Sequence, residues 1–531
     1  MRFYLLIPLI VIATVALVLF TPSSEADDEE RFDDGTFVYL VKSDTEVYID
    51  ELVYDEEGDN DLGYVTIPET VIRASDSKEF RIVGLSGYVF YRDDITGVRI
   101  SKYIRALGPG DFDGPNIASI DVDPDNPYYT DDEGVLFNKT KWNLIRYPQG
   151  KTTEHYIFPT MVSSVERYAF SYTQVKIVTL NSGMVRIGYC AFEHCYSLEH
   201  VNAAEGPDKL PSSVALIGDY AFNQCVKLTK LDLPDELEMI GTEAFGKTNI
   251  EEVKIPGNLA EIGTMAFYDC KNLKRFVLTL DYNDKFSVDE HGVLYNLDGT
   301  TLVAYPAGSE MTEYTIPDRV TDIRVNAFSG CQTLETIYLG KGMTTLPTGA
   351  FAECRSLKTI TLDKVLIIGD YCFSECESLE EVTFGSTLYY ISDGAFYQSG
   401  LKTVSFGASI GAIGSYSFGS CVLLETVTFE ADCEAKVEPL TFAGCDNLTS
   451  IYVNGYDVQF GVDSLDVYPY GIPGTVDVYI KNGFSIPADA AGLTTLNIIE
   501  EGKGPYPYEN LIGVVFCVIL IIAILAFVRE V

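Results

Sequence analysis

The sequence has few of the side chains on which most catalytic and metal sites depend. Its 531 residues include one tryptophan and four histidines, none at zinc-protease spacing (His155, His194, His200 and His291). Basic residues are also scarce, 37 against 78 acidic ones, which gives a formal net charge of −41. This charge repels the phosphate backbone of nucleic acid. The shortages exclude nucleic acid as a main partner and argue against an enzyme, a metal site or a bound cofactor. No converging acid pair and no nucleophile beside a base offsets them.

Long apolar runs, by contrast, occur at both ends of the chain. Residues 1–26 are typical of a signal peptide, because a basic residue precedes the apolar run, and Ser24 and Ala26 form a small-x-small cleavage pattern. An uncleaved signal anchor is the alternative, since the run is almost long enough to span a bilayer. Residues 511–528 predict a transmembrane helix, and Arg529 follows it as a cytoplasmic marker. We therefore expect a single-pass membrane protein at the cell surface, with its central part outside the cell.

The central part is built from a repeat. The pair Ala-Phe, or a variant of it, recurs, and most neighbouring Phe residues are 22 or 23 positions apart: Phe170, Phe192, Phe222, Phe245, Phe267, Phe328, Phe351, Phe373, Phe396, Phe418 and Phe442. Ile-Gly precedes many of these pairs, and a motif of the form Leu-x-x-Val-x-Leu follows, as in Leu357-x-x-Ile360-x-Leu362. Its last two apolar positions alternate with polar ones, as in a half-buried strand. Each repeat predicts one short strand and a compact turn that holds the Phe. About thirteen stacked turns of 22–24 residues would form a repeat solenoid with a parallel β-sheet.

The repeat sets the predicted domain boundaries. We expect an acidic segment and N-terminal cap (27–82), the solenoid (83–455), a C-terminal cap (456–500) and a stalk (501–510) before the transmembrane helix. Two inserts, near 123–160 and 281–315, contain the same module twice, Gly134-Val135-Leu136-Phe137-Asn138 and Gly292-Val293-Leu294-Tyr295-Asn296. In each module two short apolar strands flank a turn, which predicts a β-hairpin.

Cysteine is a regular part of the repeat. Eight of the twelve cysteines follow the repeat Phe by three residues: Cys195, Cys225, Cys270, Cys331, Cys354, Cys376, Cys421 and Cys445. Repeats with this Cys have one more residue between the Phe and the strand than repeats without it, so the Cys belongs to a longer turn. We interpret these cysteines as a ladder of buried free thiols that pack as small apolar groups. A disulfide framework, natural for an exported protein, is the alternative.

The outward positions of the predicted strands form a candidate binding face. Hydroxyl side chains flanked by two tyrosines stand between the inward apolar residues: Tyr338, Thr361, Thr383, Ser405, Thr428 and Tyr452. Tyrosine is a favoured contact residue in binding interfaces, so the row is a candidate platform for proteins or carbohydrates. The alternative is that threonine is simply a good strand residue on a solvated sheet.

Two further patterns carry weaker signals. The acidic stretch 121–133 is similar to a calcium loop, but Asn126 stands where an EF-hand requires Gly, which favours a solvated acidic loop over a metal site. Asn138 and Asn447 begin glycosylation sequons, which matter only in a host that glycosylates its proteins.

The repeat resembles a known family. Its unit, Ile-Gly-x-x-Ala-Phe-x-x-Cys-x-x-Leu-x-x-Val-x-Leu, is similar to that of the BspA-like (treponemal-type) leucine-rich repeats over about residues 83–455. The resemblance implies a leucine-rich-repeat-like stack and a microbial surface protein of the kind associated with adhesion and host-matrix binding, and it brings no catalytic residues. We therefore expect a membrane-anchored, non-enzymatic protein that binds host or neighbouring-cell proteins or glycans through the solenoid face. A structural envelope scaffold or spacer without a specific ligand is the alternative.

Overall fold

The computed structural model describes residues 30–53, 62–108, 110–280, 283–455, 457–466, 475–481, 485–492 and 494–501. They form β-strands and turns, with one short 3-10 helix, η1 (Ala488–Ala491). In these ranges no helix is long and apolar enough to cross a membrane. The predicted signal peptide, most of the predicted stalk and the predicted transmembrane helix lie outside the described residues. The chain divides into two compact units, Met1–Thr153 with Tyr168–Gln174, and Glu154–Arg167 with Val175–Val531.

The first unit begins with a five-stranded sheet of order β1-β2-β3-β6-β5, formed by β1 (Arg31–Asp33), β2 (Phe37–Ser43), β3 (Glu46–Leu52), β6 (Lys78–Leu85) and β5 (Thr70–Arg73). Only β3 and β6 are parallel among the neighbouring pairs of this sheet. Tyr39 and Phe80 are buried in its core. A parallel three-stranded sheet follows, formed by β4 (Gly63–Thr66), β7 (Ile95–Ile100) and β8 (Ser119–Val122).

Both insert regions contain antiparallel strands. The first unit has β9 (Tyr129–Asp132), β10 (Val135–Asn138) and β11 (Asn143–Arg146), and the second has β22 (Phe286–Val288), β23 (Leu294–Asn296) and β24 (Thr301–Ala304). A buried asparagine opens each region. Asn126 Nδ2 donates to two backbone carbonyls at 2.9 Å, and its Oδ1 accepts two backbone N–H groups. Asn283 makes the same kinds of contact, so one amide side chain replaces backbone pairing where the repeat is interrupted.

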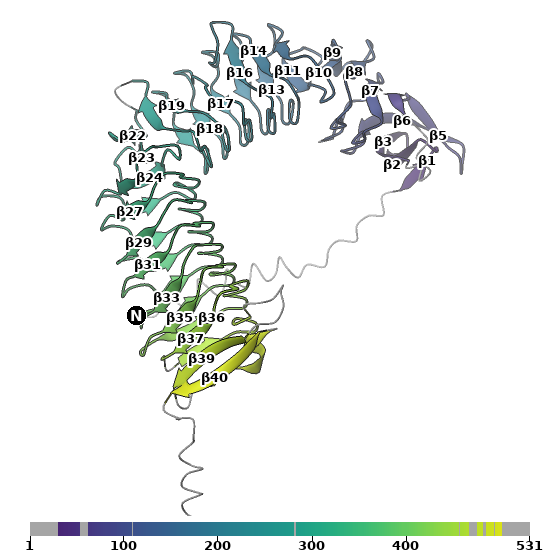
Figure 1. The fold of residues 1–531 in the computed structure, drawn as a ribbon. Coiled ribbons are helices and arrows are strands. Elements are labelled where there is room, and N and C mark those ends of the chain that lie inside the picture. The colour runs from purple at the N-terminus through teal and green to yellow at the C-terminus, as the bar shows by residue number, and fades with distance from the viewer. Residues whose placement is uncertain are drawn as a thin grey trace, which may run out of the picture. The chain divides into compact units, whose positions relative to one another are not determined.

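The second unit is a solenoid with two ranks of parallel strands, which Figure 1 shows side by side from blue to yellow. The first rank contains the predicted repeat strands together with β12 and β25 from the insert regions and β39 and β40 from the predicted C-terminal cap. It forms four sheets: β12 (His155–Ile157), β14 (Ile177–Leu180) and β16 (His200–Ala203); β19 (Glu252–Ile255) and β21 (Arg275–Leu278); β25 (Glu313–Thr315), β27 (Thr336–Tyr338), β29 (Thr359–Leu362) and β31 (Glu381–Phe384); β33 (Thr403–Phe406), β35 (Thr426–Phe429), β37 (Ser450–Val453), β39 (Thr475–Lys481) and β40 (Thr495–Glu501). On β29, Ile360 and Leu362 are buried while Thr359 and Thr361 are exposed. The predicted solenoid with parallel half-buried strands is therefore confirmed.

The second rank consists of very short strands around the Ile of the Ile-Gly motif. They are β13 (Ser164–Val165), β15 (Arg186–Ile187), β17 (Leu216–Ile217), β18 (Met239–Ile240) and β20 (Glu261–Ile262), then β26 (Asp322–Ile323) beside β24, then β28 (Thr345–Leu346), β30 (Ile367–Ile368), β32 (Tyr390–Ile391), β34 (Ala412–Ile413), β36 (Glu434–Val437) and β38 (Asp457–Phe460). The glycine of the motif is required because neighbouring turns approach closely here. A Cβ on Gly218 would lie 2.8 Å from the backbone carbon of Gly188.

The repeat phenylalanines stack between the two ranks. Rings of successive turns lie nearly parallel, as in Phe351–Phe373 (centroids 5.2 Å apart, 7° between planes) and Phe373–Phe396 (5.1 Å, 10°). Each turn is also tied to the next by its backbone, since the Phe373 N–H donates to the Ala395 carbonyl at 2.7 Å. Stacked apolar rings and backbone ties make each turn depend on its neighbours.

Each Phe-bearing turn holds two residues in the left-handed backbone region. One precedes the Ala-Phe pair, such as Tyr220 (φ 58°), and the other stands two residues after the Phe, such as Gln224 (φ 61°). Most residues at these positions are not glycine, and the left-handed conformation costs each of them about 1 kcal/mol. The stacking of neighbouring turns must offset this conformational cost.

Candidate functional site

The structure brings the six predicted face residues onto one surface of the second unit. They occupy equivalent outward positions on β27, β29, β31, β33, β35 and β37, in this order: Tyr338, Thr361, Thr383, Ser405, Thr428 and Tyr452. Strand register sets Thr361 opposite Thr383 and Ser405 opposite Thr428. We call this set the hydroxyl row. At about 4.8 Å per strand, five steps from Tyr338 to Tyr452 span about 24 Å.

The row continues beyond the residues found in the sequence. Tyr452 is in register with Tyr479 of β39, and their rings stack with centroids 4.6 Å apart and 10° between planes. Tyr479 lies in the predicted C-terminal cap, where the repeat motif is absent, so only the alternating pattern of Thr475–Lys481 points to it. The hydroxyl row therefore ends at a pair of stacked tyrosines.

The carboxylate of Glu430 contacts the hydroxyl row. Glu430 directly follows β35, and its Oε1 accepts the hydroxyl of Ser405 at 2.7 Å. At the equivalent place after β33 stands Gly407, where a Cβ would touch nothing within 4 Å, whereas the space beside Gly385, after β31, is filled by the Asp363 backbone. The row is thus flanked on this side by one open place, at Gly407, next to the Glu430 carboxylate.

The opposite border of the row is electrically balanced. Residues just before the strands alternate in charge, and the Lys358 ammonium lies 2.7 Å from a Glu335 carboxylate oxygen. Lys402 and Glu380 form the same kind of pair at 2.9 Å. In a chain of net charge −41, two ion pairs compensate charge along this border, and the six side chains of the row are themselves uncharged. The row is therefore suited to a ligand that is not recognised through net charge.

The predicted cysteine ladder lies inside the solenoid. All eight side chains are buried, and none of the cysteines in the described residues is bridged. Most of the eight donate their thiol hydrogen to the carbonyl of the repeat Phe one turn earlier, as Cys354 does to Phe328 (Sγ to O, 3.1 Å) and Cys376 to Phe351 (3.2 Å). Burial raises the pKa of Cys270 to about 12. Six of the eight thiols thus act as turn donors, and burial keeps all eight away from reagents in solvent.

The shorter turns use a hydroxyl at the same position, a feature that the sequence analysis missed. Thr248 stands three residues after Phe245, and its Oγ1 donates to the Phe245 carbonyl at 2.9 Å. Ser399 stands three residues after Phe396 and contacts Cys421 Sγ at 3.2 Å. The signal was a Ser or Thr at this position in three of the five repeats that lack the cysteine: Thr173, Thr248 and Ser399. Cys190, Cys372 and Cys433 lie off the ladder and are also buried, and Cys517 lies outside the described residues.

The acidic stretch 121–133 forms contacts within its own unit. Asp121 accepts hydrogen bonds from Tyr64 and Ser119, and Asp131 accepts the backbone N–H of Val122 at 2.9 Å. Across the described ranges, no group of three or more His, Cys, Asp or Glu residues is placed to hold a metal ion.

The two predicted sequon asparagines differ in exposure. Asn447 is exposed, and its Nδ2 donates to the Val422 carbonyl at 2.7 Å. Asn138 is half-buried at the end of β10, and its Oδ1 accepts the backbone N–H of Asn143 at 3.0 Å.

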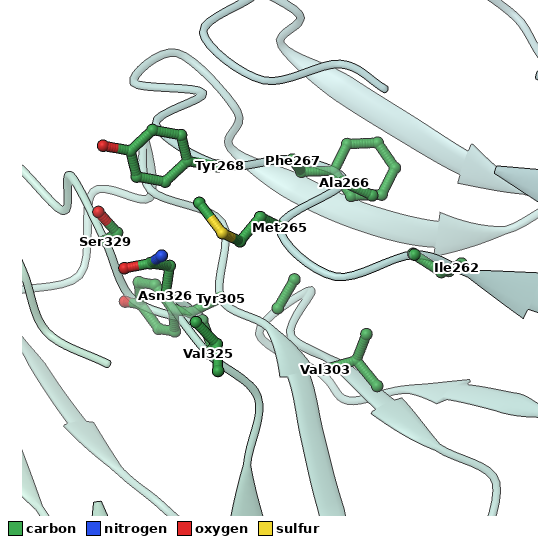
Figure 2. Close-up of a pocket in the computed structure, with 13 residues that line it drawn as sticks. Ile262, Met265, Ala266, Phe267, Tyr268, Val303, Tyr305, Val325, Asn326 and Ser329 are labelled. Atoms are coloured by element: carbon green, nitrogen blue, oxygen red, sulfur yellow. The ribbon is translucent and has the colours of Figure 1, made fainter. Parts of the chain in front are cut away.

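A small crevice, with about 20 Å³ of space for water, lies in the solenoid at the second insert. In Figure 2 the turn that carries Met265 and Phe267 lies across it from Tyr305 and Val325. No ring contact joins Phe267 to Tyr305 in the part of the chain that the structure describes, so the aromatic stack is broken here.

The two insert modules differ at the position that lines this crevice. In the first unit the equivalent of Ala304 is Arg146, which is buried and pairs with Asp113 at 2.6 Å. Ala304 has no side chain beyond Cβ and leaves the space open. Tyr305 and Ser329 line the crevice, and within the described ranges neither buried hydroxyl meets the geometry of a hydrogen bond.

A comparison with protein families agrees with this architecture. A scan of protein families matches the BspA type leucine rich repeat region in six copies over residues 147–274, 304–425 and 367–461, more than half of the chain. No curated protein matches. Solved structures that resemble the chain include a leucine rich cell surface protein from Faecalibacterium prausnitzii (20% identity, 81% of this chain and 96% of that one, TM-score 0.46). They also include the pneumococcal vaccine antigen PcpA (17%, 89% and 99%, 0.44) and a leucine-rich repeat protein from Eubacterium ventriosum (20%, 80% and 91%, 0.48).

Proposed function

Because this chain belongs to the family of BspA-type leucine-rich repeat proteins, we propose that it is a membrane-anchored cell-surface protein that binds macromolecules through the hydroxyl row. The observation that carries the proposal is the row itself. It is an outward strip of hydroxyls, bordered by paired charges and ended by tyrosines, in a chain that is otherwise strongly acidic. A surface under no constraint other than solubility would share the acidity of the rest of the chain.

The parallel strands supply a rigid platform for such binding. The backbone hydrogen bonds of the first rank hold Thr361 and Thr383 in register. Binding of a ligand that contacts several turns therefore costs no conformational entropy for ordering those turns. The exposed tyrosine at one end, Tyr338, is 51% exposed and offers a rigid, amphipathic contact.

The cellular location follows from the two apolar ends of the sequence. A signal sequence or signal anchor at 1–26 and a transmembrane helix at 511–528 would leave the two described units outside the cell. The scarcity of histidine and the burial of the described cysteines favour a binding role over catalysis.

The experiment is a binding panel with the full chain. Matrix proteins, cell-surface extracts and glycans are presented to the wild type and to a Tyr338→Ala/Tyr452→Ala variant, with matched folding checked by circular dichroism. Specific binding that is lost in the variant supports the proposal and locates the face. An absence of binding, together with self-association in light scattering, would favour a structural envelope scaffold instead.

A further inference from the structure

The C-terminal end of the hydroxyl row has the features of a sugar-binding site. Here the small side chains of Ser405 and Thr428 form a floor, and the Tyr452 ring stands at its end. Tyr479 stacks behind Tyr452 at 4.6 Å, so Tyr452 is held by a second ring and does not need to be ordered by a ligand. We propose that this place binds a neutral oligosaccharide, a proposal that rests on the binding role of the same face.

The orientation of the tyrosines favours a sugar ring. The centroid separation of 4.6 Å nearly equals the spacing of adjacent strands, so the two rings face along the solenoid axis. The front face of Tyr452 is therefore directed over Thr428, whose side chain is much shorter. A pyranose that stands upright on the floor, parallel to this ring, would place its apolar C–H face against it, while hydroxyl groups at its edge point to the floor and to the sides.

The polar groups beside the ring match those hydroxyl groups. Glu430 already accepts a hydrogen bond from Ser405 at 2.7 Å, so its carboxylate is directed toward the floor. A carboxylate accepts strong hydrogen bonds from hydroxyl donors, and the Ser405 and Thr428 hydroxyls both donate and accept. The open place at Gly407 leaves room for a sugar beside Ser405.

The charges distinguish a neutral glycan from other ligands. An acidic polysaccharide would bring its carboxylates to Glu430 in a chain of net charge −41, and repulsion would oppose its binding. A protein ligand usually needs large apolar or aromatic anchors, whereas the floor between Tyr338 and Tyr452 offers only hydroxyl side chains.

The test uses the full chain and four soluble probes, measured by isothermal titration calorimetry. Cellohexaose, laminarihexaose and mannohexaose are neutral, and hexagalacturonate is the anionic comparison. We expect at least one neutral probe to bind about tenfold or more tightly than hexagalacturonate. Tyr452→Ala should weaken that binding about tenfold or more, Tyr452→Phe should change it less than about threefold, and Glu430→Gln should weaken it several-fold.

Tyr371→Ala is the matched control, because Tyr371 is similarly aromatic and 52% exposed but stands outside the hydroxyl row. It should bind as the wild type does. The inference is overturned if no neutral probe binds, if hexagalacturonate binds as tightly, or if Tyr452→Ala and Tyr371→Ala behave alike. Binding of a matrix protein that depends on Tyr452, without binding of any neutral probe, overturns the sugar assignment and leaves the proposed function standing. Failure of every ligand overturns both.

Discussion

Replacing Phe373 by Ala tests whether the ring stack holds neighbouring turns together. Phe373 is fully buried, and its two faces are covered by Phe351 and Phe396 at 5.2 and 5.1 Å. A buried Phe→Ala change costs about 3–5 kcal/mol. Because two ring contacts of about 0.5–1.5 kcal/mol each are included in that loss, we expect about 4 kcal/mol.

This loss should appear as local opening, because each turn of a solenoid contacts only its neighbours. The backbone N–H groups of Phe373 and Glu375 donate to the carbonyls of Ala395 and Tyr397, so they report on separation of these two turns. A loss of 4 kcal/mol corresponds to about 10³-fold faster amide exchange at these positions. Hydrogen–deuterium exchange with mass spectrometry measures it peptide by peptide.

Two comparisons make the result decisive. Tyr371→Ala removes an aromatic side chain of the same turn that is 52% exposed, and it should accelerate exchange less than about tenfold. The Phe222 N–H, which donates to the Ala244 carbonyl several turns away, should be unaffected by Phe373→Ala. An acceleration below tenfold at Phe373, or an equal acceleration at Phe222, would refute the stacking argument.

Three further predictions concern buried polar groups. Burial raises the pKa of the Asp111 carboxyl to about 7, above its unfolded value, so the native state binds the carboxyl proton more tightly than the unfolded state does. The free energy of unfolding of the first unit should therefore fall by about 3 kcal/mol from pH 5 to pH 8, as the native carboxyl loses this proton. Asp111→Asn should flatten this dependence in denaturant titrations followed by the fluorescence of Trp142, the single tryptophan, which lies in that unit. Tyr305→Phe should stabilise the second unit by about 1 kcal/mol, because the buried hydroxyl that it removes has no hydrogen-bond partner within the described ranges. Tyr314→Phe should destabilise the same unit by about 1–2 kcal/mol, because the Tyr314 hydroxyl donates to the Asp289 carboxylate at 2.9 Å. Thermal denaturation of the two variants measures both changes. The ladder thiols should resist Ellman's reagent in the native protein and react in guanidinium chloride, and rapid native reaction of several thiols would contradict their burial.

The repeat made much of the second unit predictable from sequence. Apolar residues recur at fixed spacing because each turn must bury the same Phe and the same strand residues, so period and strand position follow from the pattern. The six face residues follow as well, since alternation along a strand determines which side chains point outward. Tyr479 was not predicted as part of the row, because it lies past the last full repeat, where no repeat motif aligns it with Tyr452.

The left-handed turn positions and the crevice could not be predicted from residue type. The left-handed positions of each turn hold residues as different as Tyr220, Met265 and Gln224, because the stacked turn imposes the conformation on whichever residue is there. The crevice was hidden for another reason. The two inserts share one motif and differ at Arg146 and Ala304. The sequence shows this difference, but it does not show that the turn opposite Ala304 leaves a space there.

The claim that the hydroxyl row is the binding face is tested most directly by blocking it. Thr383→Arg puts a long side chain on the exposed centre of the row, and Ile367→Arg puts the same side chain on exposed β30 of the second rank as a control. Binding of both full-chain variants is measured against the ligands that the wild type binds on the panel. We predict about tenfold or greater loss for Thr383→Arg and less than about twofold change for Ile367→Arg. Wild-type binding by Thr383→Arg, with loss in Ile367→Arg, would contradict the account.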